Sequence, residues 1–137
     1  MIRNNDTRFR GYGTARVRGN FLGIPNRFYV PRDFYNLALV HFEGHRYLTV
    51  YPFQAPRPEM PPKAIQISIG DLVISDERVL TLPNVVLPYI GTHKHMELLG
   101  FDGCFFRIFR PDVFEKYVKE YDVAGAYRKS LLDQWVA

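Results

Sequence analysis

The residues of this chain best suited to chemistry are arginines gathered near its N-terminus. Residues 1–32 hold seven arginines and one acid, whereas the rest of the chain holds 11 basic and 13 acidic residues. The first segment therefore has a formal net charge of +6, and the remainder of the chain has one of −2. A guanidinium forms forked hydrogen bonds with phosphate and with guanine, so this split favours contact with nucleic acid. The alternative is a solvated basic segment. The seven arginines are Arg3, Arg8, Arg10, Arg16, Arg18, Arg27 and Arg32.

Few other side chains form a pattern typical of catalysis or metal binding. His93-Lys-His95 is the closest histidine pair, and Cys104 is the only cysteine. A zinc site needs three or four protein ligands, so we expect no metal. Gly11-Tyr-Gly13 lacks the third glycine of a dinucleotide-binding fingerprint, and the chain has neither a Walker loop nor a nucleophile elbow. We therefore predict that the protein is not an enzyme, with no cofactor and no small-molecule substrate.

Short β-strands are the elements that must position these side chains. Alternating or continuous apolar runs bounded by Gly, Pro and Asn predict them. A helical turn is expected over 31–34, because Pro31 suits a first helical position and an acid follows it. A second turn is expected over 84–89, ending near Pro88. The predicted strands begin near residue 11 and continue over 21–24, 27–30, 37–42, 47–51, 65–69, 72–74, 79–82, 96–99 and 105–109.

The clearest helix begins at Pro111. Its apolar residues fall at i, i+3, i+4 and i+7 and form one stripe, namely Phe114, Tyr117, Val118 and Tyr121. A last helix is expected from about Ala126. Five prolines between 52 and 63 exclude a regular helix there and predict an extended linker.

One pattern occurs twice. The first copy combines Arg27–Pro31 with Gly44–Pro52, and the second combines Arg78–Pro83 with Gly103–Pro111. The closing segments are 59 positions apart and the opening prolines, Pro31 and Pro83, are 52 apart. The second copy therefore has seven extra residues between its motifs. Such a repeat predicts two half-barrels in one chain, related by pseudo-twofold symmetry.

The length fits a single compact domain that needs both halves to close its core. We divide it into a flexible basic arm (1–10), a first half-barrel repeat (11–52), a Pro-rich linker (53–63), a second half-barrel repeat (64–121) and a C-terminal helix (122–137). The single cysteine suits a reducing compartment. We find no signal peptide and no apolar stretch long enough to span a bilayer, so a cytoplasmic location is expected.

These motifs and their order resemble the MraZ family of bacterial transcriptional regulators, within the SpoVT/AbrB swapped-hairpin barrel superfamily. The resemblance covers roughly residues 21–121. It implies a mainly β fold with short helices, a duplicated swapped-hairpin β-barrel. It also implies a nucleoid-associated homo-oligomer, such as a ring, that binds double-stranded DNA with a sequence preference. The matching segments are Asn26–Pro31, Leu48–Pro52, Arg78–Pro83, Met96–Gly103 and Phe105–Phe114.

The resemblance implies DNA contacts by Arg27 and Arg78, and the basic residues Arg16, Arg18 and Arg32 would add phosphate contacts. The family motif places an Asp four residues before its arginine. In the first copy Gly23 stands at that position. In the second copy Arg78 lies five residues before Pro83, one position early, and Ser75 stands at the Asp position with Asp76 beside it, so a carboxylate that would orient the guanidinium is absent from both positions. In addition, the Pro-rich linker replaces a helical connection that mediates subunit contacts in the family.

A second hypothesis remains open. The chain is then a structural or protein-interaction module that retains the barrel and has lost DNA readout. In this reading Arg27 and Arg78 form salt bridges at the barrel rim, for instance with Asp76 or Glu77.

Overall fold

The structure, a computed structural model, describes residues 9–25, 28, 33–55, 63–101 and 105–121. Within these residues, eight strands, one 3-10 turn and two α-helices follow one another. They are β1 (Phe9–Arg18), β2 (Phe21–Gly23), β3 (Asp33–Phe42), β4 (His45–Pro52), β5 (Ile65–Ile74), β6 (Val79–Thr81), η1 (Asn84–Val86), α1 (Leu87–Ile90), β7 (His95–Phe101), β8 (Phe105–Phe109) and α2 (Pro111–Tyr121).

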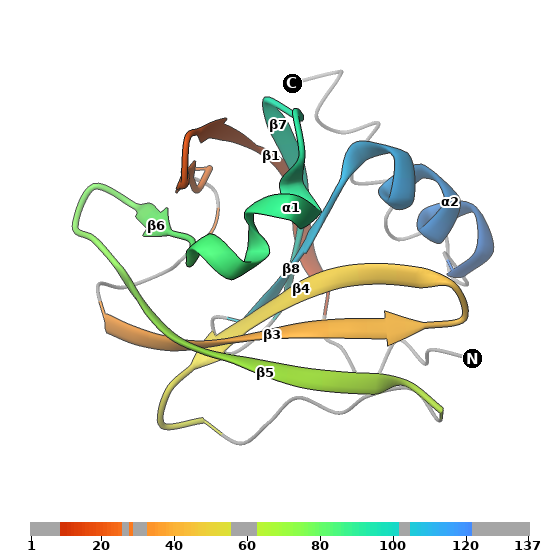
Figure 1. The fold of residues 1–137 in the computed structure, drawn as a ribbon, viewed down its shortest axis with the longest axis horizontal. Helices are drawn as coiled ribbons and strands as arrows, with labels where there is room; N and C mark the ends of the chain where they lie inside the picture. Colours follow the sequence, from red (N-terminus) through yellow and green to blue (C-terminus); the bar gives the residue numbers. More distant parts are fainter. Residues whose placement is uncertain (1–8, 26–27, 29–32, 56–62, 102–104, 122–137) are drawn as a thin grey trace.

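The strands form a closed barrel in the order β1-β2-β6-β5-β3-β4-β8-β7, and β7 pairs back to β1. All of the pairings are antiparallel. Strands β4, β3 and β5 run side by side along one side of the molecule, and α2 lies at one end of this layer (Figure 1). The prediction of a mainly β barrel with short helices is confirmed.

Several predicted boundaries are wrong. Strand β1 begins at Phe9, inside the segment predicted as an arm. Asp33 and Phe34 belong to β3, because they pair with the end of β5 and this pairing overrides the helix-start signal. The two predicted strands over 65–74 are one strand that a β-bulge keeps paired with β3. Pro88 lies in the first turn of α1 and not at its end.

Other predicted elements lie outside the described residues. They are most of the arm (1–8), most of the strand predicted over 27–30, the centre of the linker (56–62), and the helix predicted over 122–137.

The barrel interior is filled by apolar side chains that alternate along the strands with outward-facing residues. This interior core contains residues from each of the eight described strands. Its fully buried members include Ala15, Leu22, Leu48, Val50, Ile74, Leu80, Met96, Leu98 and Ile108.

Helix α2 covers the outer face of β4, β7 and β8. Its side chains Phe114, Tyr117 and Val118 are buried there, as the predicted stripe requires. The ring of Tyr117 lies 4.7 Å from that of Phe109 and 5.7 Å from that of Tyr47, measured between centroids. Each buried aromatic contributes roughly 1.5–3 kcal/mol through the area it removes from water. In the part of the chain that the structure describes, no helix has the length and apolar character to cross a membrane.

A buried arginine lies beneath this helix. Arg107 points outward from β8, directly opposite Thr49 of β4, and is 1% exposed. Its Nη1 donates a hydrogen bond of 2.8 Å to the Tyr117 hydroxyl, and its guanidinium lies 5.2 Å from the centre of the Tyr47 ring. A buried charge requires such partners, so these contacts position α2 on the barrel.

Strands β2 and β6 close the barrel, and their register relates two segments of the sequence. Leu22 lies opposite Leu80. The Ile24 N–H donates to the Arg78 carbonyl at 2.9 Å, and the Leu82 N–H donates to the Asn20 carbonyl at 2.7 Å. An offset of 58 exchanges these two hydrogen bonds, because Ile24 then becomes Leu82 and Arg78 becomes Asn20.

The hydrogen bonds in the turns after β2 and β6 are related by the same offset of 58 positions. The Phe28 N–H donates to the Pro25 carbonyl and the Val86 N–H donates to the Pro83 carbonyl, both at 3.1 Å. Pro25 follows β2 at the same distance as Pro83 follows β6. The sequence alignment matched Pro83 with Pro31, which lies outside the described residues.

Three tyrosines should make the fold sensitive to alkaline pH. Burial, together with a hydrogen bond to Glu97, raises the pKa of Tyr12 to about 12. Burial likewise raises the pKa of Tyr47 and of Tyr89 above 10. In the unfolded chain tyrosines ionise near pH 10, so the folded state binds more protons above that pH. The stability from these groups is fully present below pH 10 and is lost as the pH rises above it.

We expect the free energy of unfolding, measured with urea between pH 8 and pH 11.5, to fall steeply above about pH 10. The variant Tyr89→Phe removes one titrating group, so its stability should fall less steeply over the same range, whatever its stability at pH 8. An identical slope in the variant and the wild type would contradict this account.

Candidate nucleic-acid interface

The outer face of β1 carries two of the predicted DNA-binding arginines. Arg16 and Arg18 are exposed and alternate with Ala15, which is buried in the core, and Val17, which packs against it. Residues i and i+2 of a strand lie on the same face, roughly 7 Å apart. Because Asn20 and Gly19 turn the chain directly after Arg18, both arginines lie at the end of β1.

Residues from the start of β7 join them. His95 lies directly opposite Arg16 in the β1–β7 register, and the Lys94 carbonyl accepts a hydrogen bond of 2.8 Å from the Val17 N–H. Lys94 and His95 are exposed. Residues directly opposite in an antiparallel pair share a face, so His95 shares the outer face of Arg16, whereas Lys94 lies beside Val17 and lines the adjoining hollow. We call these four residues, Arg16, Arg18, Lys94 and His95, the basic edge.

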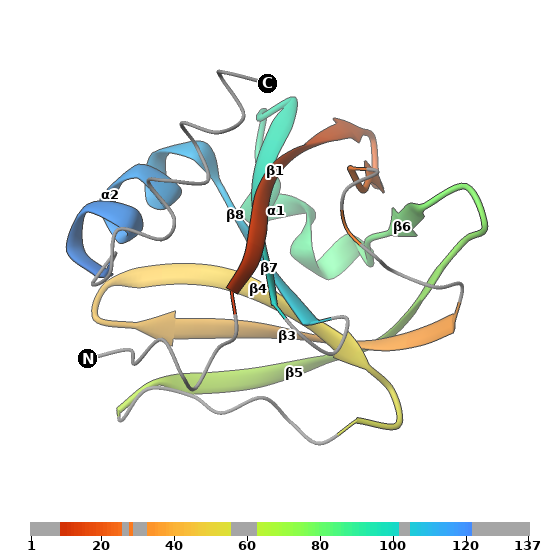
Figure 2. The same ribbon diagram turned by 180° about the vertical axis from the view of Figure 1, so that it is seen from behind.

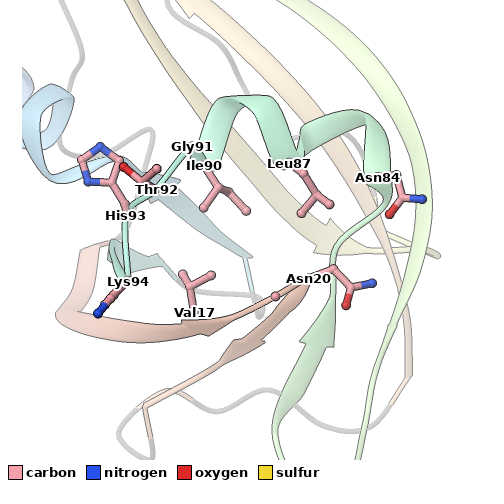
Figure 3. A pocket seen from close by; sticks show the side chains of 10 residues that line it. Val17, Asn20, Asn84, Leu87, Ile90, Gly91, Thr92, His93 and Lys94 are labelled. Carbon is pink, nitrogen blue, oxygen red and sulfur yellow. The ribbon is translucent and has the colours of Figure 1, made fainter.

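An open hollow of about 570 Å³ adjoins the basic edge. Asn20 and Asn84 lie at one end of it and His93 and Lys94 at the other (Figure 3). Apolar side chains form the wall between the two ends. The hollow is lined by Val17, Gly19, Asn20, Asn84, Leu87, Ile90, Gly91, Thr92, His93 and Lys94, none of which is acidic.

Two carboxylates, one on β7 and one on α2, are engaged by neighbouring residues. Glu97, on the outer face of β7, accepts hydrogen bonds from the Tyr12 hydroxyl and from Thr14 Oγ1, the latter at 3.3 Å. Asp112, in the first turn of α2, lies 3.3 Å from Arg110 Nε and 3.6 Å from His93 Nε2. Both carboxylates therefore face donors of their own, which lessens their repulsion of an anion at the basic edge.

Arg78 is held differently from Arg16 and Arg18. It lies in the turn between β5 and β6 with φ +65°, and its Nη2 donates to the carbonyls of Pro25, at 2.6 Å, and Phe28. The partners of this guanidinium are therefore backbone carbonyls, where the salt-bridge reading named Asp76 or Glu77. Arg27 and Arg32 lie outside the described residues. The structure thus brings two of the five predicted arginines together and ties a third to the turn at 25–28.

The turn at 25–28 also explains Gly13. A Cβ at this position of β1 would lie 2.8 Å from Cγ of Pro25. At Gly100, in β7, a Cβ would lie 3.2 Å from the ring of Phe28. Both glycines therefore allow the turn to pack closely on the barrel. This is a packing role for Gly13.

No metal site is found among the residues that the structure describes, where no group of three or more His, Cys, Asp or Glu side chains could hold an ion. Cys104 lies outside them.

Sequence reasoning did not include Lys94 and His95 among the basic residues of the site. They are separated from Arg16 by almost 80 positions in the sequence and lie outside the arginine-rich segment 1–32. Only the pairing of β1 with β7 could have found them, since it places His95 opposite Arg16.

Comparison with known proteins identifies no relative, because no protein-family model, no curated protein and no solved structure matches this chain. The assignment of a function therefore rests on the residues and their geometry.

The role of Arg78 can be tested through stability. Arg78→Ala removes both hydrogen bonds to the turn at 25–28, and we expect it to lower the free energy of unfolding by about 3 kcal/mol. Arg78→Gly loses the same bonds but accommodates the positive φ, so it should be more stable than Arg78→Ala by roughly 1 kcal/mol. Both values come from urea unfolding.

The matched control is Arg18→Ala, which truncates an exposed arginine and should change stability by no more than about 0.5 kcal/mol. If Arg78→Ala were as stable as Arg18→Ala, Arg78 would have no structural role.

Proposed function

We propose that this protein is a double-stranded DNA-binding transcriptional regulator of the MraZ type, built on a duplicated swapped-hairpin barrel and acting as a homo-oligomer at the nucleoid. The observation that carries the DNA-binding part is the basic edge beside a hollow without acidic residues. The resemblance of the sequence motifs carries the family and the regulatory role.

The duplication is supported by the strand order. If β1, β2, β3 and β4 exchange places with β5, β6, β7 and β8, every neighbouring pair of the barrel remains a neighbouring pair. Each strand pairs with one strand of the opposite half, as β1 does with β7, so the hairpins interleave. If the two halves folded separately, each strand would pair only with strands of its own half.

The register of β4 with β8 supports the same relation. Leu48 lies opposite Ile108, and Thr49 lies opposite Arg107. The offset of 59 found in the closing motifs converts the first pair into the second, because Leu48 becomes Arg107 and Thr49 becomes Ile108. A twofold axis between the two pairs would produce this pattern.

The basic edge suits phosphate contacts better than base readout. Arginine, lysine and histidine can each donate to phosphate oxygens, and Asn20, Asn84 and Thr92 add neutral donors in the hollow. With Pro25 and Pro83 as the equivalent prolines, the positions four residues before them are Phe21 and Val79. Neither can provide the arginine of the family motif. We therefore expect affinity that depends on phosphate contacts and only a weak sequence preference.

The alternative function, a protein-interaction module that has lost DNA readout, is favoured by a different feature. The outer edge of β5 exposes isoleucines, and among the described strands none pairs with it over most of its length. The two functions use different surfaces and can therefore be tested separately.

DNA binding is tested by fluorescence anisotropy with a mixed-sequence duplex over a series of salt concentrations. We expect binding at low salt that weakens as salt increases, because phosphate contacts release counterions. The double variant Arg16→Gln with Arg18→Gln should reduce the slope of log K against log salt by about 1.8, since each phosphate contact contributes about 0.9.

The matched control is Lys116→Gln with Lys119→Gln, which removes two exposed charges from α2. Its slope should equal that of the wild type if the basic edge is the binding surface. Absence of duplex binding at low salt would refute the DNA-binding proposal. An equal loss in the two double variants would show a nonspecific effect of net charge.

A further inference from the structure

Strand β5 leaves most of its outer edge unpaired by the other strands that the structure describes. One side of the strand pairs with β3 from Ile65 to Ile74, whereas on the other side the register with β6 contains only Ile74 opposite Leu80. Among the described strands, none pairs with the outer side between Ile65 and Val73. Both views show β5 as the outermost strand of the layer that it forms with β3 and β4 (Figures 1 and 2).

This edge exposes apolar side chains. Ile65 is 59% exposed and Ile67 is 54% exposed, and between Ile65 and Ile69 the strand has no charged residue and no proline. Edge strands are usually protected from pairing by such residues or by bulges. The bulge lies at Ile69 and Gly70, and Ile69 packs partly against the interior core, so Ile65 to Ser68 are the residues that remain available.

The sequence of the edge is complementary to itself. Residues 65–69 read Ile-Gln-Ile-Ser-Ile. If two copies pair antiparallel about Ile67, Ile65 of one faces Ile69 of the other and Gln66 faces Ser68. Residues directly opposite share a face, so the exposed Ile65 and Ile67 of both copies would form one apolar strip with the partly buried Ile69 at each end, and the polar residues would lie on the other face. Leu39, which lies opposite Ile67 within the chain, would extend this strip.

The flanking charges favour the same orientation. Lys63 precedes the segment and Asp71 follows it, and both are exposed. Antiparallel pairing brings each lysine near the aspartate of the other copy, whereas parallel pairing would bring like charges together.

We propose that two copies of the chain associate through their β5 edges, antiparallel about a twofold axis at Ile67. The layers of the two copies then join into one sheet in the order β4-β3-β5-β5-β3-β4. An interface of this kind uses the same surface on both copies and closes at two subunits, so a ring would need a second and different contact. Five paired residues on each side form a small interface, so the dimer is concentration-dependent. This contact does not involve the basic edge, so it can be tested independently of DNA binding.

Sedimentation velocity over the micromolar range tests the dimer directly. We expect a shift from monomer to dimer with increasing concentration for the wild type. Ile67→Lys places two like charges at the twofold axis and should raise the dimer Kd at least about tenfold. The control Val85→Lys puts the same charge on another exposed apolar residue, in η1, and should dimerise like the wild type. Circular dichroism verifies that both variants are folded.

A charge exchange tests the antiparallel orientation. Lys63→Asp and Asp71→Lys should each weaken the dimer at low salt, because each alone creates like-charge contacts. The double variant should restore the affinity of the wild type, since opposite charges meet again. A monomeric wild type throughout the range, dimerisation of Ile67→Lys equal to that of the wild type, or no recovery in the double variant would each overturn the proposed contact.

Discussion

The pairing of β2 with β6 is the contact on which the rest of the structure depends. Each strand has only three residues, so the closure relies on what surrounds the ladder. Leu22 and Leu80 lie opposite each other and are fully buried, and the hydrogen bonds from Ile24 to Arg78 and from Leu82 to Asn20 extend the pairing into both turns. An unclosed barrel would expose its apolar interior. The closure also positions the turn after β1, where the basic edge and the hollow lie.

Much of the fold follows from local patterns, whereas the site does not. The alternation in Ile65–Ile69 and the stripe of α2 predict a strand and a buried helix face because each depends only on residues close in sequence. Alternation also places Arg107 outward from β8, which by itself suggests exposure to water. The residue is buried because α2 packs on that outer face, a tertiary contact that no local pattern contains. Lys94 and His95 join the arginines for the same kind of reason.

The proposed duplication illustrates how a motif can be recognised and still be matched to a different position along the chain. An apolar residue followed by proline occurs at Pro25, Pro31 and Pro83, and an arginine four positions before Pro31 makes that alignment attractive. Hydrogen bonds between β2 and β6 distinguish the candidates, since only Pro25 follows its strand at the same distance as Pro83 does. Apolar residues specify the barrel in either alignment. The roles assigned to the polar residues depend on the alignment, because Arg27 corresponds to Val85 when Pro25 is matched with Pro83.

Under the proposed duplication, Asn20 and Arg78 occupy equivalent positions with different effects. The guanidinium of Arg78 reaches the carbonyls of Pro25 and Phe28 and ties the turn at 25–28 to the barrel. Asn20 has a shorter side chain and lines the hollow instead. The equivalent positions would thus carry an anchored side chain in one half and border the open hollow in the other. The basic edge lies beside this hollow. The two halves would therefore share the same backbone arrangement and present different surfaces.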